Sequence, residues 1–354
     1  MPALLSNLGF GVADSTSTST CMSWNRIGGE VKQRKYLQLL PQTILIIGAT
    51  GNTGKSVVRH LPKLLESSKN GTYRVLGLTR SLSSPASQKL AKLPHVEMLE
   101  KDWTTIDAAW LRSQKVTRVY IAPRNLPQQF VEESDLHIAL LHAGVKYVVR
   151  VSTNVEYIGP TNPVFYGRAH WAIENLLSQP EFKDLQWTSL QPNFFTASYL
   201  ASAAEWVKAY RTTGEQETLY ITPAADAAVA MIDPEDVGSV GAHLLALEDP
   251  TPHNQARYVL SGPEDVTGKR IVEVVEQVAG FKVESVAFKA TGWLDELVAA
   301  GVYPKKVLPS IMAGFEPLWE ERCSLAKTPT SKAILELAPP KRTVVDALKA
   351  MLEG

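Results

Sequence analysis

Gly48-Ala-Thr-Gly51-Asn-Thr-Gly54 lies directly after an apolar run at residues 43–47 and directly before a helix-like segment that begins at Lys55. Its glycines follow the spacing G-x-x-G-x-x-G. A strand that turns tightly into a helix leaves backbone amides free for an anion, and glycines let a pyrophosphate approach the backbone. The stretch therefore predicts dinucleotide binding rather than an ordinary glycine turn. The candidate contacts are Gly48, Thr50, Gly51, Asn52, Thr53 and Gly54.

From residue 43 onward, short β-branched runs alternate with helical patterns, which is the sequence form of repeated βαβ units. Near-continuous apolar strands need cover on both faces. We therefore predict an α/β fold: a doubly wound Rossmann domain with a parallel sheet, and a smaller, mostly helical C-terminal lobe. The predicted strands are residues 43–47, 73–79, 96–99, 117–122, 146–152, 185–191 and 258–261. The predicted helices are residues 54–67, 128–142, 165–177 and 194–210, with four more pieces after residue 267.

The composition excludes several classes of protein. The chain has 354 residues, of which 45% are hydrophobic, enough for a sizeable core. Its 36 basic and 36 acidic side chains balance, so nothing favours a nucleic-acid partner. The apolar runs are far shorter than the ~20 residues of a membrane span. Cys21 and Cys323 are far apart and no Cys/His metal spacing occurs, so we expect a cytoplasmic protein with reduced thiols and no metal.

Residues 1–42 form a separate segment by pattern, because they contain a low-complexity Ser/Thr run and no persistent strand or helix period. We interpret them as an N-terminal extension without a secretory signal, with a weak transit peptide as the alternative. The extension is also a candidate for a partner or homodimer interface. In residues 43–354, the Rossmann core is expected mainly at 43–200 and the substrate lobe mainly at 200–225 and 265–354.

The cofactor preference is predicted from the end of the second strand, which reads Gly77-Leu-Thr-Arg80-Ser81. An NAD site would place an acid there for the ribose 2′-hydroxyl, whereas Arg80 and Ser81 suit a 2′-phosphate. NADP(H) is therefore favoured, and the alternative is a solvent-facing loop arginine. After the third strand, Asp102 and Trp103 stand where an adenine ring is expected, although Trp103 suits the edge of the core almost equally well.

These residues resemble the NmrA-like branch of the atypical short-chain dehydrogenases/reductases. The resemblance implies NADP binding, a substrate cleft between the Rossmann domain and the lobe, and reduction of quinones or of plant and fungal natural products; some members are sensors without turnover. Pro123, which follows the fourth strand, is a further candidate for a residue that contacts the cofactor. The resemblance covers residues 43–354 and rests on the glycine stretch, Ala143–Val149 leading to Val151-Ser-Thr153, His170-x-x-x-Glu174, Trp187-Thr-Ser-Leu-Gln-Pro-Asn-Phe-Phe195 and Met231-Ile-Asp-Pro-Glu-Asp-Val237.

Catalysis is argued from Tyr166-Gly-Arg-Ala-His170, because Tyr166, His170 and Glu174 recur every four residues on one helical face. Typical short-chain reductases have Tyr-x-x-x-Lys, where the lysine lowers the pKa of the tyrosine phenol. Three readings stay open here. Tyr166 donates the proton, polarised by His170 or Arg168; or His170 is the acid, oriented by Glu174; or His170 and Glu174 are structural and hydride transfer needs only positioning.

Ser152 and Thr153 lie at the carboxyl end of the fifth strand, where they either bind a ligand or cap a turn. Phe194, Phe195 and Tyr199 follow the sixth strand and either line an apolar substrate cavity or belong to the core. The first hypothesis is an NADPH-dependent reductase of a C=O, C=N or conjugated C=C in a bulky apolar small molecule, with cyclisation as a neighbouring activity. The second is a dinucleotide-sensing regulatory protein that docks a protein partner without catalysis.

Overall fold

The computed structural model describes residues 42–66 and 73–353, which contain a seven-stranded parallel sheet. Its order is β3-β2-β1-β4-β5-β6-β8, so the order reverses between β1 and β4. All seven predicted strands are confirmed, with boundaries that differ by at most two residues. The strands are β1 Gln42–Ile47, β2 Tyr73–Thr79, β3 Val96–Glu100, β4 Val116–Ile121, β5 Tyr147–Val151, β6 Gln186–Pro192 and β8 Ala256–Leu260.

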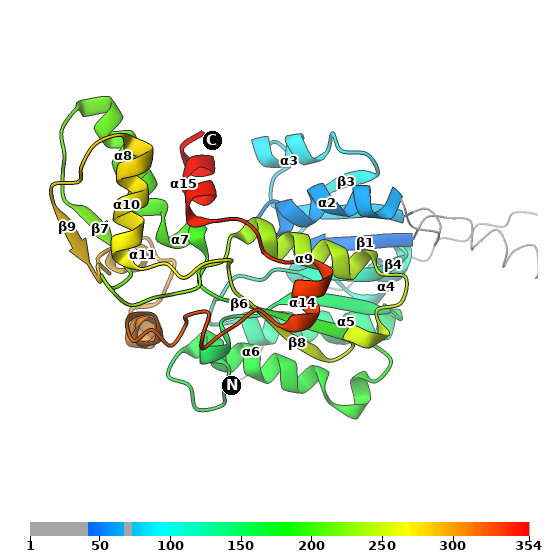
Figure 1. The fold of residues 1–354 in the computed structure, drawn as a ribbon. Helices are drawn as coiled ribbons and strands as arrows, with labels where there is room; N and C mark the ends of the chain where they lie inside the picture. Colours follow the sequence, from blue (N-terminus) through cyan, green and yellow to red (C-terminus); the bar gives the residue numbers. More distant parts are fainter. Residues whose placement is uncertain (1–41, 67–72, 354) are drawn as a thin grey trace, which may run out of the picture. The chain divides into compact units, whose positions relative to one another are not determined.

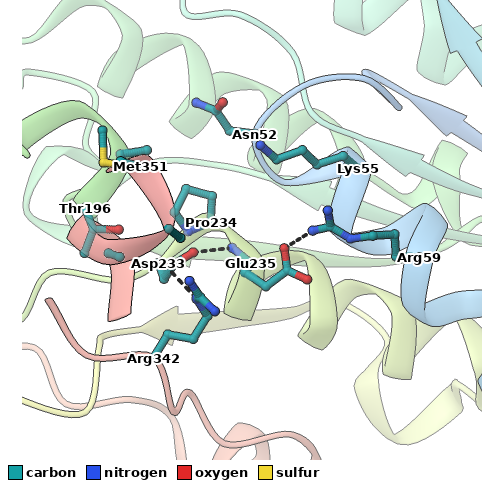
Figure 2. Close-up of a pocket in the computed structure, with 12 residues that line it drawn as sticks. Asn52, Lys55, Arg59, Thr196, Asp233, Pro234, Glu235, Arg342 and Met351 are labelled. Carbon is teal, nitrogen blue, oxygen red and sulfur yellow. Dashed lines mark hydrogen bonds and ion pairs between the residues drawn. The ribbon is translucent and has the colours of Figure 1, made fainter. Parts of the chain in front are cut away.

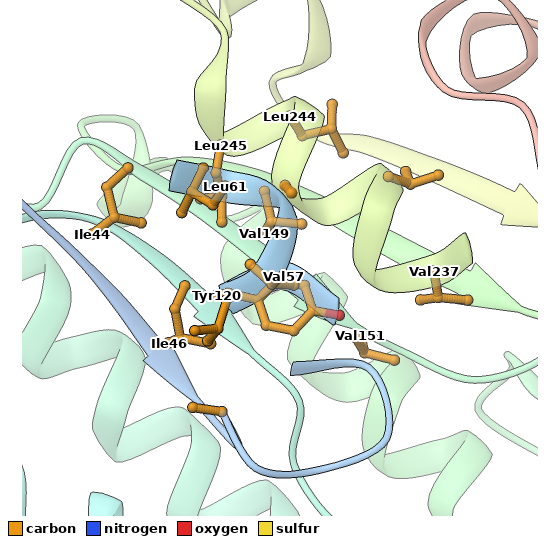
Figure 3. Packing of buried hydrophobic residues seen from close by; sticks show 14 of the residues in the cluster. Ile44, Ile46, Val57, Leu61, Tyr120, Val149, Val151, Val237, Leu244 and Leu245 are labelled. Carbon is orange, nitrogen blue, oxygen red and sulfur yellow. The ribbon is translucent and has the colours of Figure 1, made fainter. Parts of the chain in front are cut away.

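Helices cover both faces of the sheet, as predicted (Figure 1). Because successive strand side chains point to opposite faces, β1 serves two cores. Ile44 and Ile46 pack with one set of helices, as Figure 3 shows, whereas Leu45 and Ile47 pack with the other. The first set is α2 Gly54–Glu66, α3 Pro85–Leu90 and α9 Pro234–Ala246. The second set is α4 Ala108–Ser113, α5 Gln129–Ala143 and α6 Phe165–Leu177.

Several helices differ from the prediction, and six rather than four follow residue 267 among the described residues. The expected helix at 194–210 is wrong, because the structure contains α7 Thr196–Tyr199 and α8 Ala201–Thr213 instead. The backbone of Asn193 and Phe194 is held in extended form by hydrogen bonds to Leu260 and Ile232, so a helix cannot begin there. Helices α3 and α4 were not predicted, and neither was α9. Its start has a recognisable signal, since Asp233 caps the Glu235 amide at 2.8 Å and proline follows at the first helical position.

A second hydrophobic core lies in the C-terminal part of the chain, where α8 and α10 pack beside a two-stranded parallel sheet of β7 and β9. Helix α14 packs instead against α9 on the main sheet, so the chain returns to the Rossmann core near its end. The remaining elements are β7 Leu219–Ile221, β9 Val286–Phe288, α10 Gly268–Ala279, α11 Trp293–Ala299, α12 Leu308–Met312, α13 Glu316–Trp319, α14 Lys332–Leu337 and α15 Val344–Glu353.

Most of the predicted N-terminal extension, residues 1–41, lies outside the described residues, as does Cys21. Gln42 belongs to β1. Cys323 is a buried free thiol in the second core. Within residues 42–66 and 73–353, no helix combines the length and the hydropathy that crossing a membrane requires.

Candidate functional site

A cleft of about 480 Å³ opens at the carboxyl ends of the strands, where the strand order reverses. Ligands of open α/β sheets bind at such reversal points, because the flanking loops diverge there. Residues from the ends of β1, β2, β4 and β5 meet in this cleft. The residues predicted from sequence that line it are Gly48, Thr50, Gly51, Asn52, Thr53, Arg80, Trp103, Pro123 and Phe195.

The glycine stretch forms the tight turn between β1 and α2. Gly48 has a φ of +83°, a backbone conformation that side-chain-bearing residues rarely adopt, and its carbonyl accepts from the Gly51 amide at 2.9 Å. Gly54 begins α2 and packs onto the Gly48 carbonyl so closely that a Cβ there would collide with it. Gly54 therefore holds helix and strand together, while the other loop residues line the cleft.

The charge of the cleft is wholly positive among its described lining residues. Arg80, Lys101 and Arg124 line it, and no acid does. Neither Arg80 nor Arg124 forms an ion pair with another described residue, so both guanidinium charges are available to a ligand. Lys101 and Arg124 were not predicted from sequence. Both could have been found from their positions, because each follows the carboxyl end of a parallel strand, and open α/β sheets bind ligands at those ends.

The loop that carries Arg80 is fixed by local hydrogen bonds. The Thr79 hydroxyl donates to the Ser81 carbonyl at 3.0 Å, and the hydroxyls of Ser81 and Ser83 lie 2.8 Å apart. Glu100 at the end of β3 accepts from the Leu82 amide at 3.0 Å. Ser81 is not among the lining residues, so its hydroxyl shapes this loop beside the cleft.

Asp102 and Trp103 have different positions. The Asp102 carboxylate accepts from the Thr104 amide at 3.0 Å and from the Thr104 hydroxyl at 2.9 Å, which caps a 3₁₀ turn at Trp103–Thr105. Trp103, the first residue of that turn, lines the cleft. Asp102 thus positions the tryptophan ring without lining the cleft itself.

Ser152 and Thr153 follow β5 and are buried, and neither lines the cleft. The Ser152 amide donates to the Leu190 carbonyl at 2.7 Å, which extends the pairing of β5 with β6. The Ser152 hydroxyl is buried without a hydrogen-bond partner among the described residues. Val151, one residue earlier, does line the cleft and was missed by the sequence analysis.

The side chains of Phe194 and Phe195, which follow β6, lie in different places. Phe195 lines the cleft, whereas Phe194 packs into the second core with its ring edge on Tyr199, at a centroid distance of 5.1 Å. Neighbouring residues of an extended segment point to opposite sides. Asn193 holds this segment by donating to the Cys323 carbonyl at 2.9 Å and to Thr328 at 3.1 Å. The segment therefore joins the cleft to an aromatic cluster, which consists of Tyr157, Phe165, Tyr166, Phe194, Tyr199 and Tyr303.

Tyr166 belongs to that aromatic cluster and does not line the cleft. Its ring meets Tyr157 edge-on at 5.7 Å and Phe165 at 5.3 Å. Burial raises the pKa of Tyr166, and that of Tyr199 also, so both phenols keep their protons at neutral pH. Arg168 donates to the Asn162 and Pro163 carbonyls, and no hydrogen bond joins it to the Tyr166 hydroxyl.

His170 is buried and has a defined tautomer. Its Nδ1 lies 2.8 Å from the Arg150 guanidinium, and its Nε2 lies 3.0 Å from Asn125 Oδ1. Because a guanidinium only donates, Nδ1 must accept, and Nε2 carries the proton that is donated to Asn125. Burial and the Arg150 charge lower the pKa of His170 to about 3. The imidazole is therefore neutral at physiological pH and braces the loop that carries Pro123 and Arg124.

Glu174 does not orient His170 directly. It accepts from the Ser189 hydroxyl at 2.6 Å and lies 3.6 Å from Arg150, which contacts both residues. Arg150 also donates from Nε to Glu133 at 2.7 Å, and this pair is wholly inaccessible to solvent. Burial raises the pKa of Glu133, but Arg150 and the hydrogen bonds it receives outweigh that effect and hold its pKa below the usual range. Arg150 is the centre of a buried charge network.

Acid is expected to destabilise the fold below pH ~6.5, the ordinary pKa of histidine. Burial is the largest cause that lowers the pKa of both His137 and His170. Between pH ~6.5 and the folded pKa of His170, about 3, the unfolded chain binds more protons than the folded chain, so stability falls as pH falls. At a pH well below ~6.5, His170 contributes a slope that approaches roughly 1.4 kcal/mol per pH unit, and His137 adds to it in the same direction.

Urea unfolding followed by circular dichroism between pH 7 and pH ~5 measures this slope, above the range in which carboxylates titrate. His170→Gln should remove one histidine's share while keeping a side chain that can bond Arg150 and Asn125. An unchanged slope in that variant would show that His170 is protonated alike in both states.

Comparison with known proteins gives a family match and two similar oxidoreductases. The sequence model of the NmrA-like family matches residues 41–321. An uncharacterized oxidoreductase of Bacillus subtilis, YesF, is 26% identical over 268 residues, which is 73% of this chain and 79% of that protein. A (4-alkanoyl-5-oxo-2,5-dihydrofuran-3-yl)methyl phosphate reductase of Streptomyces griseus is 24% identical over 237 residues, 67% of this chain and 74% of that enzyme.

Solved structures show the same fold. The NADPH-dependent quinone oxidoreductase of Escherichia coli, solved with NADPH, superposes with a TM-score of 0.63 at 20% identity, over 87% of this chain and 99% of the enzyme. The triphenylmethane reductase of Citrobacter, solved with NADP(H), gives 0.62 at 18% identity, over 88% and 100%. At these identities the likeness is one of fold.

Proposed function

Because this chain belongs to the NmrA-like family, we propose that it is an NADPH-dependent reductase of a C=O, C=N or conjugated C=C bond in a bulky apolar small molecule. The observation that carries this proposal is the cleft, in which three cations and no acid surround the glycine loop among the described lining residues. NADPH carries a pyrophosphate and a 2′-phosphate, and this charge distribution suits such a polyanion.

Residues at the two ends of the cleft bind different parts of the cofactor. Thr50 to Thr53 receive the pyrophosphate at the start of α2, and Arg80 bonds the 2′-phosphate, with Trp103 at the adenine end. Val151 and Phe195 supply the apolar wall for the nicotinamide end. When bound, NADPH supplies the hydride. The protein contributes orientation and excludes water.

The apolar substrate is proposed to bind beside Phe195, on the side of the aromatic cluster behind it. Arg124 of the cleft acts electrostatically on Tyr303 of that cluster, although burial dominates and raises the pKa of Tyr303. Tyr303 in turn packs on Phe165 at 6.5 Å. One similar structure is that of a quinone oxidoreductase, and one similar enzyme is a reductase of an alkanoyl-substituted dihydrofuranone that carries a methyl phosphate group; both support a conjugated acceptor.

His170 is proposed to be a positioning residue rather than an acid. It acts through Asn125 on the loop between β4 and α5, two residues from Pro123. Burial and, after it, the Arg150 charge keep its imidazole neutral, so the bond to Asn125 persists over the physiological pH range. The His170→Gln variant should therefore raise the KM for NADPH more than it lowers kcat.

Tyr166→Phe is expected to lower kcat for a carbonyl acceptor by roughly 100-fold, the usual contribution of a positioned general acid. The phenol holds its proton at neutral pH, and for this role its hydroxyl would have to reach the acceptor from the aromatic cluster beside the cleft; because burial raises its pKa, it would act mainly as a hydrogen-bond donor to the developing oxyanion. Tyr210→Phe is the matched control, since Tyr210 packs on Phe281 and Trp206 elsewhere in the second core region. Full turnover in Tyr166→Phe would leave hydride transfer dependent on positioning alone.

The proposal is tested by NADPH oxidation with a panel of quinones, enones and imines, with NADH in parallel. We expect consumption of NADPH with apolar conjugated acceptors and little consumption of NADH. Calorimetry reports NADPH binding separately. A dinucleotide sensor would be favoured instead if NADPH bound tightly without turnover on any acceptor and a protein partner bound only in the presence of cofactor. The neutral His170, which stands where typical short-chain reductases have lysine, also suits a sensor.

A further inference from the structure

A second hollow, of about 500 Å³, lies between the first turns of α2 and α9 and the helix α15 (Figure 2). It shares Asn52 with the cofactor cleft. Thr196 lines it as well, whereas the preceding residue, Phe195, lines the cofactor cleft. Two adjacent residues of one segment thus face two hollows. Apart from Asn52, no residue of the second hollow takes part in the function proposed above.

The accessible charge in this hollow is positive. Arg59 pairs with Glu235, and Arg342 pairs with Asp233 at 2.9 Å. In each pair the cation is the more exposed partner: the side chains of Arg59 and Glu235 are 38% and 25% exposed, and those of Arg342 and Asp233 are 34% and 10% exposed. Both acids are therefore engaged in ion pairs, and in each pair the arginine is the partner more accessible to solvent.

Lys55 adds a charge without a counterpart, because its ammonium has no ion-pair partner among the described residues, and Figure 2 shows it beside Asn52. The hydroxyl of Thr196 is also unpaired. It is buried, with the residue 1% exposed, and has no hydrogen-bond partner among the described residues. Figure 2 shows this hydroxyl turned toward Asp233 and Pro234. Buried polar groups are rarely left unpaired, so this one indicates a missing partner.

The remaining wall is apolar. Ala347, Ala350 and Met351 of α15 line the hollow together with Ala197. A ligand that matches the whole surface has an anionic head for Lys55 and the two arginines and a short apolar body for α15. We propose that this hollow is a second ligand site, which binds a small organic carboxylate or phosphate next to the cofactor.

The site is tested by calorimetry on the full chain with inorganic phosphate, phenyl phosphate and hexanoate, without NADPH and with NADPH at saturation. With the cofactor cleft filled, phenyl phosphate and hexanoate should still bind, and more tightly than inorganic phosphate. Lys55→Glu should weaken that binding by roughly tenfold or more, the loss expected for a charge-assisted contact. Ala350→Trp should weaken it by filling the hollow without changing its charge.

Lys63→Glu is the matched control, because Lys63 is exposed on the same helix and does not line the hollow. It should keep both anion and NADPH affinity, and Lys55→Glu should weaken anion binding more than it weakens NADPH binding. Equal anion binding in all variants, or loss of anion binding once NADPH is present, would overturn the proposal. The readout is binding, so it does not depend on whether the chain reduces anything. Competition of the anions with the acceptor would identify a substrate subsite, and its absence a separate effector site.

Discussion

Replacing Arg80 by glutamate is expected to weaken NADPH binding by roughly 100-fold and to leave NADH binding within a small factor. Hydrogen bonds to a charged group contribute about 1.5–3 kcal/mol each, and tenfold in affinity corresponds to about 1.4 kcal/mol. Loss of the guanidinium and the new repulsion between a carboxylate and the 2′-phosphate act in the same direction. Arg80 is exposed and forms no ion pair with another described residue, so the fold should tolerate the change.

Calorimetry with NADPH and NADH measures this effect as a ratio, which cancels any general weakening of the cleft. Arg80→Gln should lie between the wild type and Arg80→Glu, because it removes the charge without reversing it. Arg211→Glu is the matched control, since Arg211 is an exposed arginine in the last turn of α8 and does not line the cleft. An NADPH affinity that survives Arg80→Glu would exclude Arg80 as the 2′-phosphate contact.

Arg150→Met is expected to destabilise the fold by about 3–5 kcal/mol, the cost of leaving a buried charge without its partner. Arg150 is wholly buried and donates to Glu133 at 2.7 Å, to Ser189 at 3.0 Å and to His170 at 2.8 Å. Without it, Glu133 loses the charge that holds its pKa below the usual range. His170 would lose the donor to its Nδ1 as well.

Thermal and urea unfolding of Arg150→Met measure this cost. Arg257→Met provides the comparison: Arg257 also pairs with a buried acid, Glu174, at 3.1 Å, but its side chain is 39% exposed, so its removal should cost far less. The double variant Arg150→Met, Glu133→Leu should recover part of the loss, because both charges are then gone. A loss below about 1 kcal/mol in the single variant would contradict the role of Arg150 as the centre of the network.

The sequence by itself determined the fold class, because its evidence is local. The glycine spacing between an apolar strand and a helix, and the apolar runs separated by helical patterns, are properties of neighbouring residues. The carboxyl ends of parallel strands share one edge, so Arg80 and Pro123 could be assigned to the cleft from their positions alone. The start of helix α9 is also marked locally, by Asp233 at the cap and Pro234 at the first helical position.

Only the tertiary structure decided where individual side chains lie and what they contact. Phe194 and Phe195 are chemically identical, but an extended backbone sends one to the core and the other to the cleft. From the sequence, His170 could be an acid, a group that polarises Tyr166 or a structural residue, and only the fold shows that Arg150, twenty positions away, donates to it. The tautomer and the pKa of a side chain depend on burial and on charges brought close by folding, and sequence spacing does not record those distances.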